Sequence, residues 1–295
     1  MLYLESFRLP DGDEEDGYLL SYPYQLEMQC YSHENVYPFR VFPEKGLREV
    51  SFEPITVLYG GNGSGKSTLL HLVAEKLSIP TLSPFGVTPY FPSYLDFCHY
   101  TLAPNCRKIP EGSEKIVSDD VFDFLLDTRS INEGIDRKRN ELFEEYASLR
   151  ETPMRPLSSL EDFEAFKRQG EAKRRTKSDF TARRLPKEMS GNSNGESAFV
   201  FFTRHVKENA LYLLDEPENS LSASMQMELA RFLEDSARFY GCQLVISTHS
   251  PFLLSMRGAK IYDLDARPVA PRRWTELGQV RAYFDFFKSH EKEFD

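Results

Sequence analysis

The sequence has no continuous apolar stretch of the roughly 20 residues that a membrane-spanning helix needs. Its first residues turn acidic at once and lack the basic and apolar blocks of a signal peptide. Only four cysteines are present, none of them in a CxxC pair. The stretch "CHYTLAPNC" (98–106) offers three metal ligands at most, and no second cluster completes a zinc site. These absences predict a cytoplasmic protein with reduced cysteines and no membrane partner.

Length and composition fit a soluble protein with a real core. The 295 residues suffice for one large α/β domain with an insertion, or for two modest domains. Hydrophobic residues make up 40% and charged residues 28% of the chain. The formal net charge of -10 argues against a general nucleic-acid coat but leaves room for a local basic face.

Apolar periodicity predicts the elements of the first half. The first 50 or so residues read as short antiparallel strands with a solvated acidic turn at "PDGDEEDG" (10–17). "ITVLYG" (55–60) predicts a buried strand and "KSTLLHLVAEKL" (66–77) an amphipathic helix. Residues 81–110 read as irregular. Residues 119–150 predict a helix, a break near Gly134 and a second, charged helix.

The second half alternates helices with buried strands. Residues 158–187 read as mostly helical and basic, followed by a helix at 195–206, a strand at 210–216, a helix at 222–240 and a strand at 242–248. This alternation predicts an α/β fold with a mostly parallel sheet flanked by helices. We expect a nucleotide-binding core built from 1–80 and 188–268, a mainly helical insertion at 81–187, and a helical tail at 269–295.

The strongest motif is "GGNGSGKS", which matches GxxxxGK[ST] in full, directly after a strand and before a helix. Its glycines let successive backbone N–H groups point at phosphate oxygens, and the helix N-terminus adds partial positive charge. Lys66 is expected to reach the β- and γ-phosphates, and the Ser67 hydroxyl to bind Mg²⁺. The predicted ATP-binding residues are Gly60, Gly61, Asn62, Gly63, Ser64, Gly65, Lys66, Ser67 and Thr68.

Two carboxylates follow the later buried strand, in "LYLLDEPENSLS" (211–222). Asp215 is suited to hold Mg²⁺ opposite Ser67. Glu216 is placed to orient or deprotonate an attacking water. Adjacent acidic residues also stand at the start of many loops without a catalytic role. An apolar run that ends in Asp-Glu-Pro, in a chain that also has a P-loop, favours a catalytic role.

"LLDEP", "ENSLS" and the later "STHSPFLL" together resemble the ABC-type P-loop ATPases. The likeness is to the branch that includes the structural-maintenance-of-chromosomes (SMC) proteins and many stand-alone bacterial ATPases of AAA type. The resemblance implies a P-loop NTPase fold with an N-terminal antiparallel β portion and a helical insertion. It implies that His249 is the residue that contacts the γ-phosphate, and that Asn219, Ser220, Leu221 and Ser222 form the D-loop.

"SGNSNGE" (190–196) resembles a shortened form of the ABC signature, about 20 residues before the acidic strand end. In the family this segment closes over the ATP that another subunit holds. The resemblance therefore implies an ATP-dependent homodimer. The signature residues would be Ser193, Asn194, Gly195 and Glu196.

The sequence departs from the family pattern in one respect. The glutamine that normally senses Mg²⁺ and the attacking water is missing, because no Gln lies between Gln29 and Gln169. Ser118 or Asp119 is our candidate substitute. This departure predicts slow hydrolysis. For the adenine contact, Tyr37 and Phe39 are candidates, although aromatic residues there also suit a core.

Residues 167–187 form a basic stretch in an otherwise acidic chain, with nine Lys or Arg against two acidic residues. This stretch either contacts DNA or RNA phosphates, or is a solvated face or a dock for an acidic partner protein.

Two functions remain open: an ATP-hydrolysing dimerising switch, and a nucleotide-gated binding module with little or no turnover. Too few residues follow His249 for a nuclease domain, and the motif details favour the soluble branch over a transporter subunit. The resemblance also implies an effector protein, for instance in phage defence.

Overall fold

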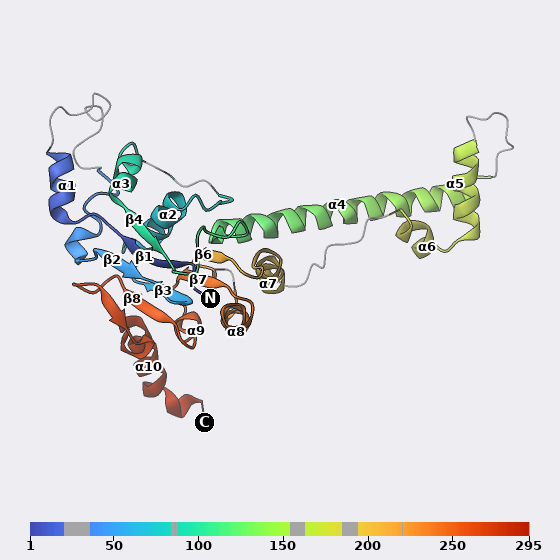
Figure 1. Ribbon diagram of the computed structural model, residues 1–295. Helices are drawn as coiled ribbons and strands as arrows, with labels where there is room; N and C mark the ends of the chain where they lie inside the picture. The colour runs from blue at the N-terminus through green and yellow to red at the C-terminus, as the bar shows by residue number, and fades with distance from the viewer. Residues whose placement is uncertain are drawn as a thin grey trace. The chain divides into compact units, whose positions relative to one another are not determined.

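The buried strands predicted from the sequence line up in one sheet. The structure, a computed structural model, describes residues 1–20, 36–83, 86, 88–153, 163–184, 194–219 and 221–294. They fall into two units, residues 1–122 with 198–295, and residues 123–197. Figure 1 shows the elements of both. Within the described part of the chain, no helix is long and apolar enough to cross a membrane.

The first unit contains a six-stranded sheet in the order β5-β6-β7-β3-β8-β9. All neighbouring strands are parallel except the β8–β9 pair at the edge. This sheet confirms the predicted α/β fold with a mostly parallel sheet. The strands are β3 (Ile55–Tyr59), β5 (Glu114–Val117), β6 (Leu211–Asp215), β7 (Gln243–Ser247), β8 (Lys260–Asp263) and β9 (Ala270–Arg272).

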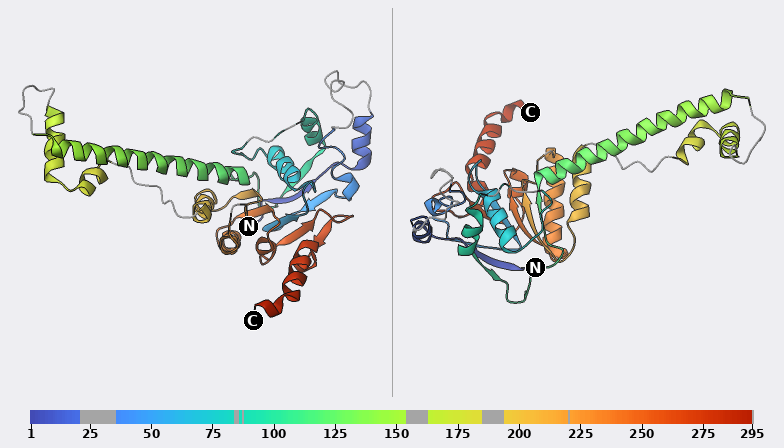
Figure 2. Two further views of the ribbon diagram at one scale, coloured as in Figure 1. Left: turned by 180° about the vertical axis from the view of Figure 1, so that it is seen from behind. Right: turned by 90° about the horizontal axis from the view of Figure 1, so that it is seen from above.

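Helices cover both faces of this sheet, as the views of Figure 2 show. Helix α2 (Lys66–Lys76) packs against β6 and β7, and α8 (Ala223–Phe239) packs against β7. Every residue of β3 and of β7 is buried. A strand covered on both faces needs apolar side chains in continuous runs, which explains "ITVLY" and the similar run at β7. The other helices after residue 193 are α7 (Asn194–His205), α9 (Pro251–Leu254), η3 (Trp274–Glu276), α10 (Gly278–Ser289) and η4 (Glu291–Glu293).

A smaller antiparallel sheet, in the order β2-β1-β4, confirms the predicted N-terminal β portion. Its strands are β1 (Leu4–Arg8), β2 (Glu49–Ser51) and β4 (His99–Leu102). Side chains of β1, α2 and β6 meet in one hydrophobic core. That core fixes α2, and with it the loop that precedes α2, relative to the strands.

The prediction of an acidic turn at 10–17 is wrong, because helix α1 (Gly12–Leu19) forms there. Asp11 caps it: its side chain accepts a hydrogen bond from the backbone N–H of Glu14, and the Glu14 carboxylate accepts one from the N–H of Asp11. This reciprocal cap, together with acids in the first turn, stabilises a helix start. The acids that suggested a turn are therefore the capping residues of a helix.

Two further expectations need correction. Residues 81–110 are not wholly irregular, since they contain α3 (Phe91–Phe97) and β4, which pairs with β1. The expected break near Gly134 is also absent, because α4 (Ser118–Glu151) is one continuous helix. A single glycine costs a helix only about 1 kcal/mol relative to alanine, which 34 residues of helix readily absorb.

The second unit is helical. It consists of most of α4 together with α5 (Phe163–Arg174) and α6 (Lys177–Ala182). Its small core is made of Leu142, Tyr146, Ala172 and Phe180. The short helix η2 (Pro43–Lys45) belongs to the first unit.

Candidate nucleotide-binding site

The turn between β3 and α2 has the glycine-dependent geometry of a phosphate-binding loop. Gly60 and Gly65 have φ angles of 155° and 96°. A Cβ atom on Gly60 would lie 2.7 Å from the Ser64 Oγ, and one on Gly65 would lie 3.1 Å from the Val41 Cγ1. Only glycine fits both the backbone conformation and the space. The chain therefore turns tightly into α2, whose N-terminus carries the partial positive charge that attracts an anion.

Lys66 is buried, and its ammonium is held inside the site. The Nζ donates to the Gly60 carbonyl at 2.7 Å and to the His249 Nε2 at 2.8 Å, and lies 3.7 Å from the Glu216 Oε1. Because an ammonium can only donate, the His249 Nε2 is the acceptor in this contact. One cation thus connects the loop, the acidic strand end and the histidine.

The register of the sheet brings the acidic strand end to the loop. Ser247 at the end of β7 lies beside both Leu58 of β3 and Asp215 of β6. The Ser67 Oγ donates to the Asp215 Oδ1 at 3.1 Å, and the Ser247 hydroxyl donates to the same oxygen. A hydroxyl and a carboxylate this close are oxygen ligands that Mg²⁺ accepts. These residues therefore fit the predicted magnesium site.

Glu216 has a strained backbone, and its side chain faces the same edge of the sheet. Its φ is 49°, a left-handed conformation that costs a non-glycine residue about 1–2 kcal/mol. Its N–H donates to the Ser247 carbonyl at 3.0 Å, which holds this conformation. The Oε2 accepts from the Asn219 Nδ2 at 3.1 Å, and the Oε1 lies 3.4 Å from the His249 Nε2. The side chain is 30% exposed, so water can reach it.

The segment that carries His249 is fixed by a buried carboxylate that sequence reasoning missed. The Glu218 Oε1 accepts from the Thr248 hydroxyl at 2.6 Å and from the backbone N–H groups of His249 at 2.7 Å and Ser250 at 3.1 Å. Burial raises the pKa of Glu218, and these donors offset part of that rise. Tyr59 packs edge-on against the imidazole, with ring centroids 6.5 Å apart. The signal for Glu218 was present in "DEPE", but only the first two acids were interpreted.

Two further residues support the loop from segments far away in the sequence. The Lys45 Nζ donates to the carbonyls of Ser64 at 2.8 Å and Leu264 at 2.9 Å. The Asp265 Oδ2 accepts from the Gly61 N–H at 2.7 Å. No local pattern marks these residues, because their contacts depend on the packing of β8 and η2 beside the loop.

Lys115 on β5 is a second buried cation close to this edge of the sheet. It is 1% exposed, and its Nζ lies 3.5 Å from the Nδ1 of His71 on α2. Burial lowers the pKa of Lys115, whereas the nearby carboxylates of Asp215 and Asp120 raise it. Burial, and then the charge of Lys115, lower the pKa of His71 to about 4. Sequence reasoning missed both residues, since a lysine in a strand usually points to solvent.

The other residues of the phosphate loop differ in exposure. Ser64 and Thr68 are buried, whereas Asn62 and Gly63 are exposed. The Thr68 Oγ1 accepts from the Tyr37 hydroxyl at 2.9 Å, which places Tyr37 beside the loop. Phe39 is a core residue instead: it is 2% exposed and packs against Tyr18 and Tyr94. Phe39 is thus excluded as the residue that stacks on adenine.

The candidate glutamine substitutes follow the end of β5. Val117 pairs with Asp215, so Ser118 and Asp119 leave the sheet at the edge where Asp215 lies. Ser118 is the first residue of α4 and is half-buried, and Asp119 is exposed. Asp120, not Asp119, accepts from the Val117 N–H, at 2.8 Å.

The segment predicted to form the D-loop lies between Glu216 and α8. Asn219 hydrogen-bonds to Glu216, Leu221 is buried, and the Ser222 side chain caps α8 by accepting from the Met225 N–H at 3.4 Å. Ser220 lies outside the described residues.

Of the residues predicted to form the signature, Ser193 also lies outside the described part of the chain. Asn194, Gly195 and Glu196 form the first residues of α7, so these three stand at a helix N-terminus. That placement suits a segment that binds an anion.

A family model described as "AAA domain, putative AbiEii toxin, Type IV TA system" matches residues 99–255, which is 157 of the 295 residues. The matched segment contains the acidic strand end and His249. Among curated proteins, no sequence matches the chain.

Several solved structures have a similar fold. They include the SMC head domain from Thermotoga maritima (13% identity, 91% of this chain and 98% of that chain covered, TM-score 0.40). Another is the Smc head domain with an extended coiled coil bound to the C-terminal domain of ScpA, from Pyrococcus furiosus (12% identity, 99% and 100% covered, TM-score 0.43). A third is a nucleotide-free ATP-binding cassette from an ABC transporter (16% identity, 80% and 87% covered, TM-score 0.38).

Proposed function

The chain belongs to this family of AAA-domain proteins, and from that premise we propose that it is a slow ATPase that acts as an ATP-dependent dimerising switch. One observation carries the proposal. Lys66, Asp215, Glu216 and His249, from three segments of the chain, meet at one edge of the sheet beside a glycine loop.

Each of these residues has a role in the proposed reaction. The loop N–H groups and Lys66 bind the triphosphate and stabilise the charge that develops on the γ-phosphate. Ser67 and Asp215 would hold Mg²⁺, which neutralises phosphate charge when bound. Glu216 accepts the proton of the attacking water, whose oxygen forms a bond to the γ-phosphorus while the bond from this phosphorus to ADP breaks and ADP leaves. Once Lys66 turns from the His249 Nε2 to the phosphate, the ring can carry its proton on Nε2 and donate a hydrogen bond to the γ-phosphate.

The dimer proposal rests on the signature segment at the start of α7. One γ-phosphate is already served by the loop of its own chain, so a second anion-binding helix start suits the nucleotide of another copy. ATP would then join two copies head to tail, and hydrolysis would release them. The effector that reads this cycle, for instance in phage defence, is proposed from family resemblance alone.

The Glu216→Gln variant tests catalysis. It keeps the shape and hydrogen-bonding oxygen of the side chain but cannot accept the proton. We expect ATP binding to persist while phosphate release falls about 10²–10³-fold, the usual cost of losing a general base. Normal phosphate release by this variant would contradict the proposal.

A second candidate, a nucleotide-gated binding module with little or no turnover, is favoured by the missing glutamine. Ser118 and Asp119 have shorter side chains than glutamine and thus reach less far toward an attacking water. Phosphate release by the wild-type chain, measured with and without DNA or RNA, separates the two. Sustained turnover that Glu216→Gln abolishes would exclude the second candidate.

A further inference from the structure

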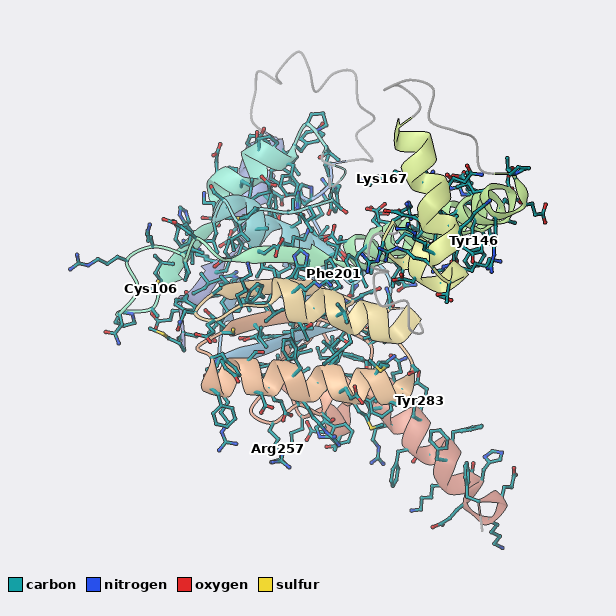
Figure 3. The ribbon with its side chains drawn as sticks, turned by 90° about the vertical axis from the view of Figure 1, so that its right-hand side faces the viewer. Cys106, Tyr146, Lys167, Phe201, Arg257 and Tyr283 are labelled. Carbon is teal, nitrogen blue, oxygen red and sulfur yellow. The ribbon has the colours of Figure 1, made fainter. Side chains whose placement is uncertain are left out.

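The helical unit carries a basic hollow that the proposed ATPase function does not use. Its volume is about 400 Å³. The residues that line it come from α4, from α5 and from the turn after α6. They are Lys138, Leu142, Lys167, Arg168, Glu171 and Arg184. Figure 3 labels Lys167 on α5 and Tyr146 on α4, both within this unit.

The hollow has a fixed wall. Leu142 is 2% exposed and belongs to the small core of this unit, together with Phe180. Arg184 is held in place by that core: its Nη1 donates to the Phe180 carbonyl at 2.8 Å, and its guanidinium lies 3.9 Å from the centre of the Phe180 ring. A cation anchored in this way loses little conformational entropy when it binds a ligand.

The charge of the hollow is positive. Four cations and one carboxylate are among the described residues that line it, a net charge of +3. Glu171 pairs with Arg184, and two carboxylates outside the lining also pair with its cations: Glu145 lies 2.6 Å from the Nε of Arg168, and Glu141 lies 2.8 Å from Lys138. Counting these two as well, the balance is four cations against three acids, so the hollow remains cationic in a protein of net charge -10.

The positive charge continues along the same helices. Residues 163–184 contain eight Lys or Arg and three acids. Lys173, Arg174, Lys177 and Arg183 are exposed on this segment. Some of this charge is used internally, since the Lys173 Nζ donates to the Thr152 carbonyl at 3.0 Å. A single small anion would need only the hollow, whereas a row of cations suits a chain of phosphates.

We propose that this hollow and the adjoining face of α5 bind the phosphodiester backbone of a nucleic acid. The hollow receives one phosphate between Lys138, Lys167 and Arg184, and the neighbouring cations take the next ones. None of the described residues that line the hollow has an aromatic ring on which a base could stack. Binding is therefore expected to be insensitive to base sequence and strongly dependent on salt. This inference does not depend on ATP hydrolysis or on the dimer.

The test measures fluorescence anisotropy of labelled single-stranded and duplex DNA with the full chain, without nucleotide, at several salt concentrations. The variant is the double substitution Lys138→Glu with Lys167→Glu. The control is Lys207→Glu, which reverses an exposed charge outside the helical unit. We expect the double variant to weaken binding at least about 10-fold and the control about 2-fold. The salt slope of the double variant should fall by about 1–2, because each phosphate contact contributes ~0.7–0.9.

Three outcomes would overturn the proposal. The first is an absence of DNA binding by the wild-type chain. The second is an equal loss of binding for Lys207→Glu and for the single variant Lys167→Glu, since this would assign binding to the general charge of the protein and not to the hollow. The third is competition by millimolar inorganic phosphate that fully displaces DNA, which would identify free phosphate as the ligand. Unchanged thermal unfolding and ATP turnover establish that the variants are folded.

Discussion

The sheet edge and the helical unit use the same kinds of charged side chains in opposite ways. At the edge, Lys66 is 5% exposed, and its partners are set by the register of three parallel strands. In the helical unit, the pairs Arg168–Glu145 and Arg175–Asp179 lie on helix surfaces, with side chains that are 29–48% exposed. Buried charges at strand ends lie at fixed distances from their partners and have few other partners within reach. Exposed charges on helices mainly set an electrostatic potential and can exchange partners.

The largest effect is expected at the sheet edge. Lys66→Ala removes the only cation that contacts the loop carbonyls, His249 and Glu216 together in the described residues. We expect ATP turnover to fall about 10³-fold, as for loss of a principal charge-stabilising group. Phosphate release measures it, with Lys207→Ala on the exposed surface as the control. A fall in ATP turnover of less than 10-fold would contradict this prediction, because the buried site would then tolerate loss of its cation as an exposed surface does.

The helical unit should depend on its core and not on its ion pairs. Phe180→Ala empties a fully buried position, and we expect a loss of about 3–5 kcal/mol in the stability of this unit. Arg168→Ala breaks an exposed pair and should cost about 1 kcal/mol or less. Limited proteolysis in rising urea compares the two variants. Equal losses of stability for the two variants would contradict the expectation that the core, and not the ion pairs, stabilises the helical unit.

Stability should vary with pH through Glu15, a buried carboxyl near the aromatic core. It is 2% exposed, and burial, the largest cause, raises its pKa from 4.5 to about 7. Ionising it in the folded state is therefore unfavourable. The cost is absent below about pH 4.5, grows as the pH rises to about 7 and is constant above, at up to about 3 kcal/mol.

Glu15→Gln removes this cost while keeping an oxygen that can accept from the Arg40 N–H, as Glu15 does at 2.6 Å. We expect the variant to unfold at a higher temperature than the wild type at pH 8 and at a similar temperature at pH 4.5. Thermal unfolding at both pH values measures the difference. A gain of the same size at both would exclude titration of Glu15 as its cause.

The smallest effect is expected where a carboxylate contacts the phosphate loop. Asp265→Asn keeps an acceptor for the Gly61 N–H but removes one negative charge beside the proposed triphosphate. Since this carboxylate is solvent-accessible, we expect ATP affinity to rise only a few-fold. Titration with a fluorescent ATP analogue measures it. Weaker binding would mean that the charge itself holds the loop in place.

Local sequence was enough to predict the parts whose chemistry is local. The glycine loop, the buried strands β3, β6 and β7, and the positions of Asp215 and Glu216 all follow from short motifs with fixed spacing. The continuous α4 and the capped α1 were missed because a lone glycine and a run of acids each fit two local structures.

Contacts between residues far apart in the chain could not be predicted from the sequence. Lys45 reaches Leu264 across 219 positions, and Lys115 meets His71 only because β5 and α2 pack together. The motifs implied that Lys66 and Glu216 act on the same nucleotide, but the hydrogen bond between Lys66 and His249 depends on the register of β7 beside β3. Packing decides these contacts, and no motif encodes it.

Light scattering of the Glu216→Gln variant with saturating Mg-ATP tests the central proposal most directly. The account predicts a species of twice the mass of the 34.1-kDa chain, which is lost when Ser193 is also replaced by arginine. A Glu216→Gln protein that binds ATP yet keeps the mass of one chain would contradict it.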